Sequence, residues 1–159
     1  MKLTLKKILA LGAGALAIIA FIMAFVSPLK MVAGSTTVAA EAKDIYFEKG
    51  GTIIPFFGYV LVLIAGIVLI ARQFVDFKAS FKLAIAFLVV GVVLIFLTKT
   101  LYITSSISEN WKGMPASYVA AYKEAMKESI KLNTGVIFGA ILAIASAVVA
   151  FVAEKFIQD

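Results

Sequence analysis

The stretch TGVIFGAILAIASAVVAFVA, residues 134–153, contains no charged side chain. A helix needs about 20 apolar residues to cross the hydrocarbon core of a bilayer. In lipid the backbone must satisfy its own hydrogen bonds, so an isolated stretch of this kind has to be helical. Residues 134–153 are therefore predicted to form a membrane-spanning helix.

Three earlier runs have the same character, and they cover residues 8–26, 52–71 and 83–103. The third is free of charge only from Leu83 to Thr98. We expect Lys82 and Lys99 to extend their amino groups toward the interfaces, while 101–103 lengthen the helix. The four runs predict an all-α integral membrane protein, a four-transmembrane-helix bundle that forms a single domain over residues 1–159.

The composition agrees with lipid as the solvent, because 63% of the residues are hydrophobic and only 15% are charged. Soluble domains are about 45–50% apolar. The net charge of +6 comes from Lys and Arg residues near the ends of the apolar runs. Anionic lipid headgroups explain that placement better than nucleic acid, so membrane lipids are expected partners and nucleic acid is not.

Both Cys and His are absent from the chain. Disulfides, the usual proton shuttle and the commonest metal ligands are therefore excluded. None of the uncharged cores of the four runs carries an ionisable residue that would indicate a proton or ion path. We expect no catalytic residue, no cofactor and no metal site, and hence no enzyme.

Four spans place both termini on one side, together with seven of the 15 Lys and Arg residues. These seven are crowded into the two ends and the 72–82 loop, whereas the other eight are spread over longer segments. Cytoplasmic segments are the richer in Lys and Arg. We expect a multi-pass protein with both termini in the cytoplasm. The Lys-rich start and the Ala, Ile, Val and Phe usage suggest the bacterial cytoplasmic membrane.

The start of the chain also resembles a secretory signal, with the basic stretch MKLTLKK, an apolar run and the sequence VAAEA at 38–42. The apolar run 8–26 is longer than the roughly 7–15 residues of a signal core. We therefore interpret it as the first membrane helix.

The connections are two external segments, 27–51 and 104–133, and a cytoplasmic loop, 72–82. The loop reads RQFVDFKASFK, in which aromatic rings alternate with cations. Such residues anchor helices at the headgroup level. The predicted interfacial anchors are Arg72, Phe74, Phe77, Lys78, Phe81 and Lys82.

The second external segment contains an apolar stripe with helical spacing over 116–132. We predict an extra amphipathic external helix there, with a partner surface made of Trp111, Tyr118, Tyr122, Met126 and Ile130. The helix either caps the bundle, rests on the membrane or binds a partner protein. It either ends before the fourth span or continues into it as one helix from Pro115 to Ala153. Its mixed charge argues against a purely lipid-binding helix.

Two runs carry rows of small residues spaced three and four apart. The row in the first run is Ala13, Ala17, Ala20 and Ala24, and the row in the fourth is Gly135, Gly139, Ala143, Ser146 and Ala150. Small residues let helices approach closely in lipid. We expect these rows to form a helix-packing seam, either within the chain or between subunits. The bulkier runs 52–71 and 83–103 are expected to face lipid more.

The layout of four spans, two external segments and both ends inside is similar to that of the eukaryotic claudin-type tetraspan proteins. Their first external segment carries a Trp-centred motif and a Cys pair. Residues 27–51 contain neither Trp nor Cys, and Trp111 lies in the second segment. We therefore do not assign the chain to that family.

The leading hypothesis is a non-catalytic integral membrane protein that acts as an accessory or scaffold subunit through helix–helix and external contacts. Its partners would be copies of itself or other membrane-protein subunits. The alternative is a small oligomeric channel or transporter with the path between protomers. That path needs a polar stripe, and the spans offer only Tyr59, Thr98, Thr134 and Ser146.

Overall fold

The computed structural model describes residues 4–76 and 80–157, and most of them are helical. The helices are α1 Leu5–Ile22, extended by the 3₁₀ turn Met23–Phe25, α2 Ala42–Tyr46, α3 Ile54–Ala71, α4 Ser80–Phe96, α5 Thr98–Asn110, α6 Ala116–Ser129 and α7 Thr134–Lys155. The strands are β1 Leu29–Ala33, β2 Thr36–Ala39 and β3 Ile130–Leu132.

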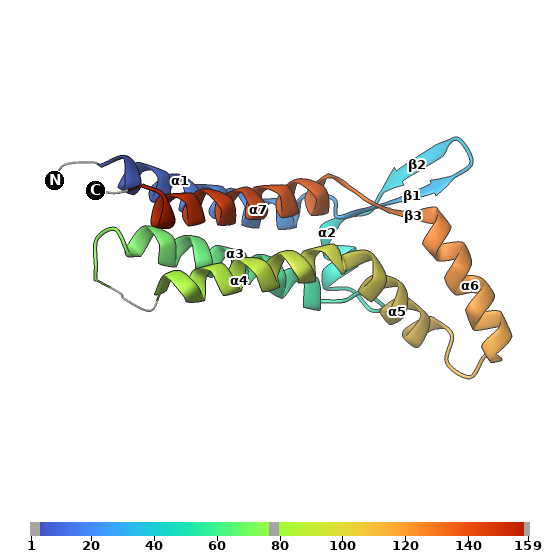
Figure 1. Ribbon diagram of the computed structural model, residues 1–159. Coiled ribbons are helices and arrows are strands. Elements are labelled where there is room, and N and C mark those ends of the chain that lie inside the picture. The colour runs from blue at the N-terminus through green and yellow to red at the C-terminus, as the bar shows by residue number, and fades with distance from the viewer. Residues whose placement is uncertain (1–3, 77–79, 158–159) are drawn as a thin grey trace.

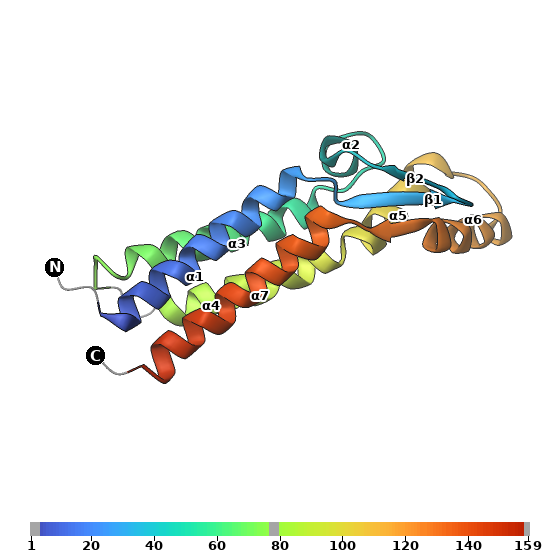
Figure 2. The ribbon, with the colours of Figure 1, turned by 90° about the horizontal axis from the view of Figure 1, so that it is seen from above.

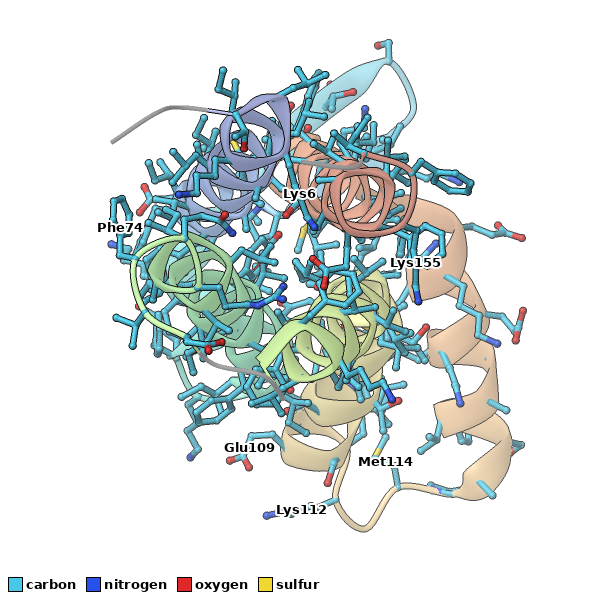
Figure 3. The ribbon with its side chains drawn as sticks, turned by 60° about the vertical axis from the view of Figure 1, so that its left-hand side comes forward. Lys6, Phe74, Glu109, Lys112, Met114 and Lys155 are labelled. Atoms are coloured by element: carbon cyan, nitrogen blue, oxygen red, sulfur yellow. The ribbon has the colours of Figure 1, made fainter. Side chains whose placement is uncertain are left out.

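The long helices α1, α3, α4 and α7 lie side by side (Figure 1). We call the end where α1 begins and α7 finishes the inner end, and the opposite end, with the sheet, α2, α5 and α6, the outer end. A second view shows the same separation of long helices from the outer elements (Figure 2). Seen from the inner end, the four helices surround a common core, with α1 beside α3 and α7, and α4 beside the same two (Figure 3).

Three of these helices are long and apolar enough to cross a membrane, namely Leu5–Phe25, Ile54–Ala71 and Thr134–Lys155. A fourth is added if α4 and α5 count as one bent span. The chain thus has the helical content and the helix lengths of a helical membrane protein.

The third run differs from its expected form, because it does not continue as one helix to residue 103. It breaks after Phe96, and α5 leaves the line of α4 at 52°. The buried Thr98 hydroxyl donates a 2.6 Å hydrogen bond to the Ile95 carbonyl. A Thr side chain that bonds to the preceding turn competes with the helical ladder and bends the helix.

The helices α3 and α4 pack backbone to backbone at a pair of glycines. A Cβ on Gly58 would lie 2.8 Å from the Gly91 carbonyl oxygen, and one on Gly91 would lie 2.7 Å from the Gly58 carbonyl oxygen. The expectation that these two runs face lipid more than the first and fourth runs is not met by α3. Its buried share, 39%, equals that of α7 and exceeds the 33% of α1.

The outer end holds a three-stranded antiparallel sheet in the order β2-β1-β3, which the sequence analysis did not anticipate. Gly34, at φ +62°, begins the two-residue turn between β1 and β2. Glycine is favoured there because only it adopts this conformation without strain. The strand β3 comes from the second external segment, so the sheet joins the two segments to each other.

Hydrogen bonds tie this sheet to the bundle. The Asn133 amide donates to the Pro28 carbonyl at 2.9 Å, and the Gly135 amide donates to the Ser27 carbonyl at 3.0 Å. The Asn133 side chain also donates to the Ser27 hydroxyl at 2.9 Å, and that hydroxyl donates to the Ala40 carbonyl at 2.7 Å. The outer ends of α1 and α7 are thereby fixed together.

Candidate functional site

The two rows of small residues lie in the interior of the bundle, where α1 packs against α7. All nine residues are buried: Ala13, Ala17, Ala20 and Ala24 on α1, and Gly135, Gly139, Ala143, Ser146 and Ala150 on α7. The Ser146 hydroxyl donates a 2.7 Å hydrogen bond across the contact to the Ala13 carbonyl. In this structure the rows therefore serve packing within one chain.

Some of the same residues also face α3. A Cβ on Gly139 would lie 2.7 Å from the Tyr59 ring. The Tyr59 hydroxyl donates a 2.9 Å hydrogen bond to the Gly135 carbonyl. On the other side, a Cβ on Gly66 would lie 2.9 Å from the Ala17 Cβ. The small residues thus let three helices approach one another, and not only the two named from the sequence.

The polar side chains of the spans are used inside the protomer. Tyr59, Thr98 and Ser146 are each 0% exposed and each donates a hydrogen bond to a backbone carbonyl. Of the polar residues available for a path between copies, only Thr134 is exposed, and it begins α7 at the outer end. Because these buried hydroxyls are already hydrogen-bonded within the chain, they stabilise the fold.

At the outer end, α6 forms over 116–129 as an amphipathic helix, but it does not continue into α7. Residues 130–132 form β3, in which Ile130 pairs with Met31 of β1. The alternative of one helix from Pro115 to Ala153 is therefore wrong. The helix stops because the sheet supplies a buried place for Ile130, which is 3% exposed.

The predicted partner surface is correspondingly split. Ile130 is buried in the sheet and is not available to a partner, whereas Tyr118 is 63% exposed. Trp111 and Tyr122 stack on each other, with ring centroids 4.3 Å apart. Met126 is half-buried and lines a groove together with Tyr122 and residues of β1. Four of the five predicted residues thus remain on or near an open surface.

A groove of about 320 Å³ runs between β1 and α6. It is lined by Met31, Val32, Ala33, Tyr122, Ala125, Met126, Ser129 and Ile130. Val38 of β2 is the Cα partner of Met31 and is exposed, so the apolar surface continues across the sheet. Sequence reasoning missed the strand residues because only the sheet brings them beside α6. We call this surface, from Val38 across Met31 to Tyr122 and Tyr118, the outer groove surface.

The described chain covers α6 only in part. All of its residues are described, and none of them is buried. Isolated helices of fewer than about 12–15 residues are marginal in water, so tertiary packing normally supplies most of their stability. Helix α6, with 14 residues, contacts α5, β1 and β3, stacks Tyr122 on Trp111, and accepts a 2.7 Å hydrogen bond at the Lys127 carbonyl from the Lys99 ammonium.

At the inner end, the predicted anchors have different surroundings. Phe74 is 63% exposed and Lys82 is exposed, as interfacial anchors are expected to be, and the labelled Phe74 points away from the bundle (Figure 3). Phe77 and Lys78 lie outside the described residues. Two of the anchors, Arg72 and Phe81, turn inward instead.

Arg72 is held between α7 and α4. Its guanidinium forms a 3.2 Å ion pair with Glu154 and lies 5.1 Å from the centroid of the Phe81 ring. The Arg72 side chain is only 16% exposed. Arg72 and Phe81 thus make contacts within the chain that the sequence pattern did not predict, because a carboxylate on another helix attracts the guanidinium and the ring covers it.

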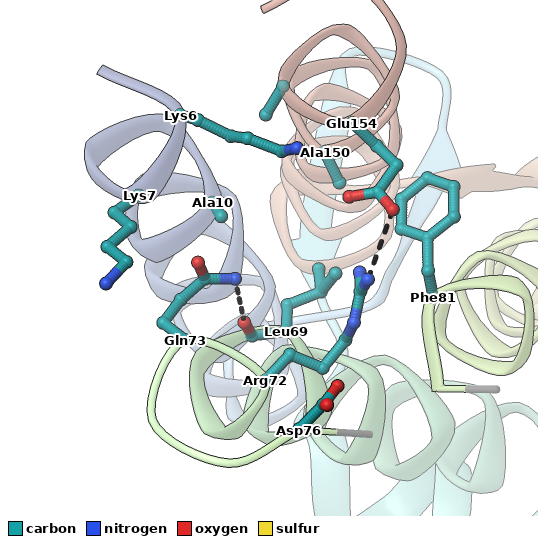
Figure 4. A pocket seen from close by; sticks show the side chains of 11 residues that line it. Lys6, Lys7, Ala10, Leu69, Arg72, Gln73, Asp76, Phe81, Ala150 and Glu154 are labelled. Atoms are coloured by element: carbon teal, nitrogen blue, oxygen red, sulfur yellow. Dashed lines mark hydrogen bonds and ion pairs between the residues drawn. The ribbon is translucent and has the colours of Figure 1, made fainter. Parts of the chain in front are cut away.

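Around Arg72 lies a cavity of about 350 Å³, open at the inner end (Figure 4). We call it the inner cavity. It is lined by Lys6, Lys7, Ala10, Leu69, Arg72, Gln73, Asp76, Phe81, Ala150, Ala153 and Glu154. All four long helices thus contribute to it, and Lys6 reaches from α1 across toward α7 (Figure 4).

One further buried group lies where the bundle meets the outer elements. Tyr46 of α2 is 2% exposed, and among the described residues its hydroxyl has no hydrogen-bond partner. Its ring packs edge-on against Tyr59, with centroids 6.4 Å apart. Burial raises the pKa of Tyr46 to about 12.

Comparisons with protein-family models, with curated proteins and with solved structures found no match for this chain.

Proposed function

We propose that this protein is a multi-pass membrane protein with four spans and both termini in the cytoplasm. In this proposal it is a non-catalytic accessory subunit that holds another membrane-protein subunit against its outer end. The partner contacts the outer groove surface, while the four long helices supply a rigid support. The observation that carries the proposal is α6, an amphipathic helix with no buried residue.

The proposed spans agree with the lengths of the helices. The three helices long enough to cross alone span 18 to 22 residues, and α4 has 17. A bilayer core about 30 Å thick needs roughly 17–25 residues. In this arrangement the bent α5 carries the third span out of the membrane. The denser cations at the inner end support placing that end in the cytoplasm.

The exposure of α6 and of the neighbouring sheet supports the proposal that a partner binds there. Met31, Val38, Tyr118 and Tyr122 are all at least 36% exposed on one face of the outer end. Contiguous exposed apolar surface of this kind, rimmed by polar residues, marks interaction sites in folded proteins. Tyr and Trp are also the residues most enriched among those that dominate interface energies.

The charge on α6 favours a protein over a lipid surface as the occupant. Its cations Lys123 and Lys127 are matched by Glu124 and Glu128. Lipid-binding amphipathic helices are instead rich in Lys and Arg on the polar face. A neutral helix with exposed Tyr side chains therefore fits a protein partner better.

The alternative of a path between copies has little support. Three of the four hydroxyls that could line it, those of Tyr59, Thr98 and Ser146, are buried in the protomer and bonded to carbonyls, and the fourth, that of Thr134, lies at the outer end of α7. A path formed on the outside of the bundle would have to run along aliphatic side chains. We therefore keep the accessory subunit as the proposal.

The membrane arrangement can be tested cleanly because the chain contains no Cys. Single-cysteine variants Ser35→Cys, in the β1–β2 turn, and Phe156→Cys, after α7, are exposed to a membrane-impermeant maleimide on intact cells. We expect Ser35→Cys to react at once and Phe156→Cys to react only after permeabilisation. Labelling of both in intact cells would contradict the proposal.

The partner is tested by photo-crosslinking in the native membrane. A photoreactive phenylalanine replaces Tyr118 on the exposed apolar stripe or, as the matched control, Ala120 on the opposite side of the same helix. We expect a single membrane protein to be captured in near-stoichiometric yield from position 118 and not from position 120. Equal capture at both positions, or capture of lipid only, would contradict the proposal.

A further inference from the structure

The inner cavity has a charge that one anionic group would balance. Its lining includes three cations, Lys6, Lys7 and Arg72, and two anions, Asp76 and Glu154. The excess is one positive charge. Arg72 already forms a 3.2 Å ion pair with Glu154, so these two charges neutralise each other before any ligand binds. Lys6 and Lys7, both near the start of α1, are the other two cations of the lining.

The position of the cavity matches that of a headgroup. It lies where α1 begins and where α3 and α7 end, so its mouth is at the level of the proposed cytoplasmic interface. Basic pockets between membrane helices on the cytoplasmic side bind anionic lipid headgroups. An amide side chain, that of Gln73, lies at the same rim and donates to the Leu69 carbonyl at 3.2 Å.

A second, wholly apolar depression lies between α4 and α7, farther from the inner end. It has a volume of about 240 Å³ and is lined by Leu88, Val89, Val92, Val93, Ile144, Ala147 and Val148. We call it the α4–α7 groove. It occurs where neighbouring long helices pack least closely.

The cavity and the groove are in line along both helices. From Phe81 in the cavity to Leu88 in the groove is seven residues along α4, and from Glu154 to Ala147 is seven residues along α7. At 1.5 Å per residue the groove is about 10 Å deeper than the cavity on each helix. A polar site followed at this depth by an apolar groove has the polarity profile of a phospholipid.

We propose that the inner cavity and the α4–α7 groove together bind one anionic phospholipid. The phosphate lies in the cavity near Lys7 and Arg72, and one acyl chain lies along the α4–α7 groove. This inference rests on the membrane insertion proposed above, but it does not depend on any partner at the outer end.

The test uses the full-length protein purified in a mild detergent, with dioleoylphosphatidylglycerol as the anionic probe. Dioleoylphosphatidylcholine and inorganic phosphate are the comparison ligands. Binding is followed by native mass spectrometry and by the shift in melting temperature. We expect one bound phosphatidylglycerol per chain and at least tenfold weaker binding of both comparison ligands.

Two variants with matched controls locate the site. Lys7→Gln is expected to weaken phosphatidylglycerol binding about tenfold, whereas Lys82→Gln, which removes the same charge outside the cavity, changes it less than twofold. Ala147→Phe fills the groove and is expected to weaken lipid binding, while Ile137→Phe on the same helix does not. Arg72 is left unchanged, because its removal would leave Glu154 partly buried without its cation.

The outcomes separate the lipid site from the proposed function. Equal binding of phosphatidylcholine, or equal effects of Lys7→Gln and Lys82→Gln, would overturn the site. Binding of inorganic phosphate as tight as that of the lipid would overturn the lipid as its ligand. If the cysteine labelling shows insertion while these tests fail, only this inference falls. If labelling shows no insertion, both fall.

Discussion

The bundle and the outer end of this molecule differ in how far they bury their apolar side chains and pair their polar ones. In the bundle, small residues and glycines bring backbones together, and the buried hydroxyls of Tyr59, Thr98 and Ser146 all find carbonyl acceptors. At the outer end, α6 buries no residue, and aromatic and aliphatic side chains remain exposed. This contrast is the basis of our proposal that a partner completes the outer end.

The largest effect is expected from filling the glycine contact between α3 and α4. In Gly91→Leu the new Cβ would lie 2.7 Å from both the Gly58 carbonyl oxygen and the Val62 side chain. Overpacking of this kind should lower the free energy of unfolding by about 3 kcal/mol. The matched control is Gly12→Leu, whose added Cβ has no atom within 4 Å, and it should change stability by less than about 0.5 kcal/mol. Similar melting curves in detergent for the two variants would show that the contact is not close.

A pH effect is expected at the boundary between the two regions. Because burial raises the pKa of Tyr46 from 10.0 to about 12, the unfolded chain loses this proton at lower pH than the folded chain. Between these values the unfolded state binds fewer protons, so the free energy of unfolding falls as pH rises. Tyr46→Phe should remove this component from the stability profile between pH 10 and 12. An identical slope in the variant would mean that Tyr46 is hydrated in the folded protein.

A smaller difference is expected between two buried hydroxyls. Tyr59→Phe removes a 2.9 Å hydrogen bond to the Gly135 carbonyl and should lower the free energy of unfolding by about 1 kcal/mol. At neutral pH Tyr46→Phe removes no hydrogen bond within the described chain and should be neutral or slightly stabilising. Chemical unfolding of the two variants in the same detergent compares them directly. A larger loss of unfolding free energy from Tyr46→Phe than from Tyr59→Phe would contradict this, because it would mean that the Tyr46 hydroxyl is hydrogen-bonded in the folded protein.

The smallest effect on stability, and the largest on assembly, is expected at α6. Tyr118→Ser changes a side chain that is 63% exposed, so the free energy of unfolding should shift by less than about 0.5 kcal/mol. The amount of co-purified partner should nevertheless fall at least tenfold, as for truncation of an interface residue that dominates binding. Ala120→Ser, on the far side of the same helix, is the control and should retain the partner.

Much of the fold was predictable from local signals. Uncharged runs near 20 residues long, such as 134–153, are enough to indicate helices for a membrane. The spacing of small residues indicated which sides of α1 and α7 are buried, because close packing favours them. Apolar periodicity also gave the position of α6 over 116–129.

What the sequence could not reveal depends on contacts between distant segments. The short strand β3 exists because Ile130 and Leu132 pair with β1, about a hundred residues earlier in the chain. The helical spacing of Tyr122, Met126 and Ile130 continues past the end of α6 at Ser129, so the sequence pattern did not indicate the change from helix to strand. The inward turn of Arg72 likewise depends on Glu154, which local pattern does not place beside it.

The α3–α4 contact was underestimated for a related reason. One glycine on each helix, Gly58 and Gly91, makes the approach, and neither forms a row of small residues. A single glycine becomes informative only when its neighbour across the contact is known. Bulky composition along the rest of each helix was a poor guide to which side is buried.

The most direct test of the central claim is the mass of the complex gently extracted from its native membrane, with its components identified by mass spectrometry. The proposal predicts a stoichiometric membrane-protein partner that is retained in Ala120→Ser and lost in Tyr118→Ser, while the chain itself remains folded. A lone monomer, or a complex that Tyr118→Ser leaves intact, would contradict the view that the outer end is completed by a partner.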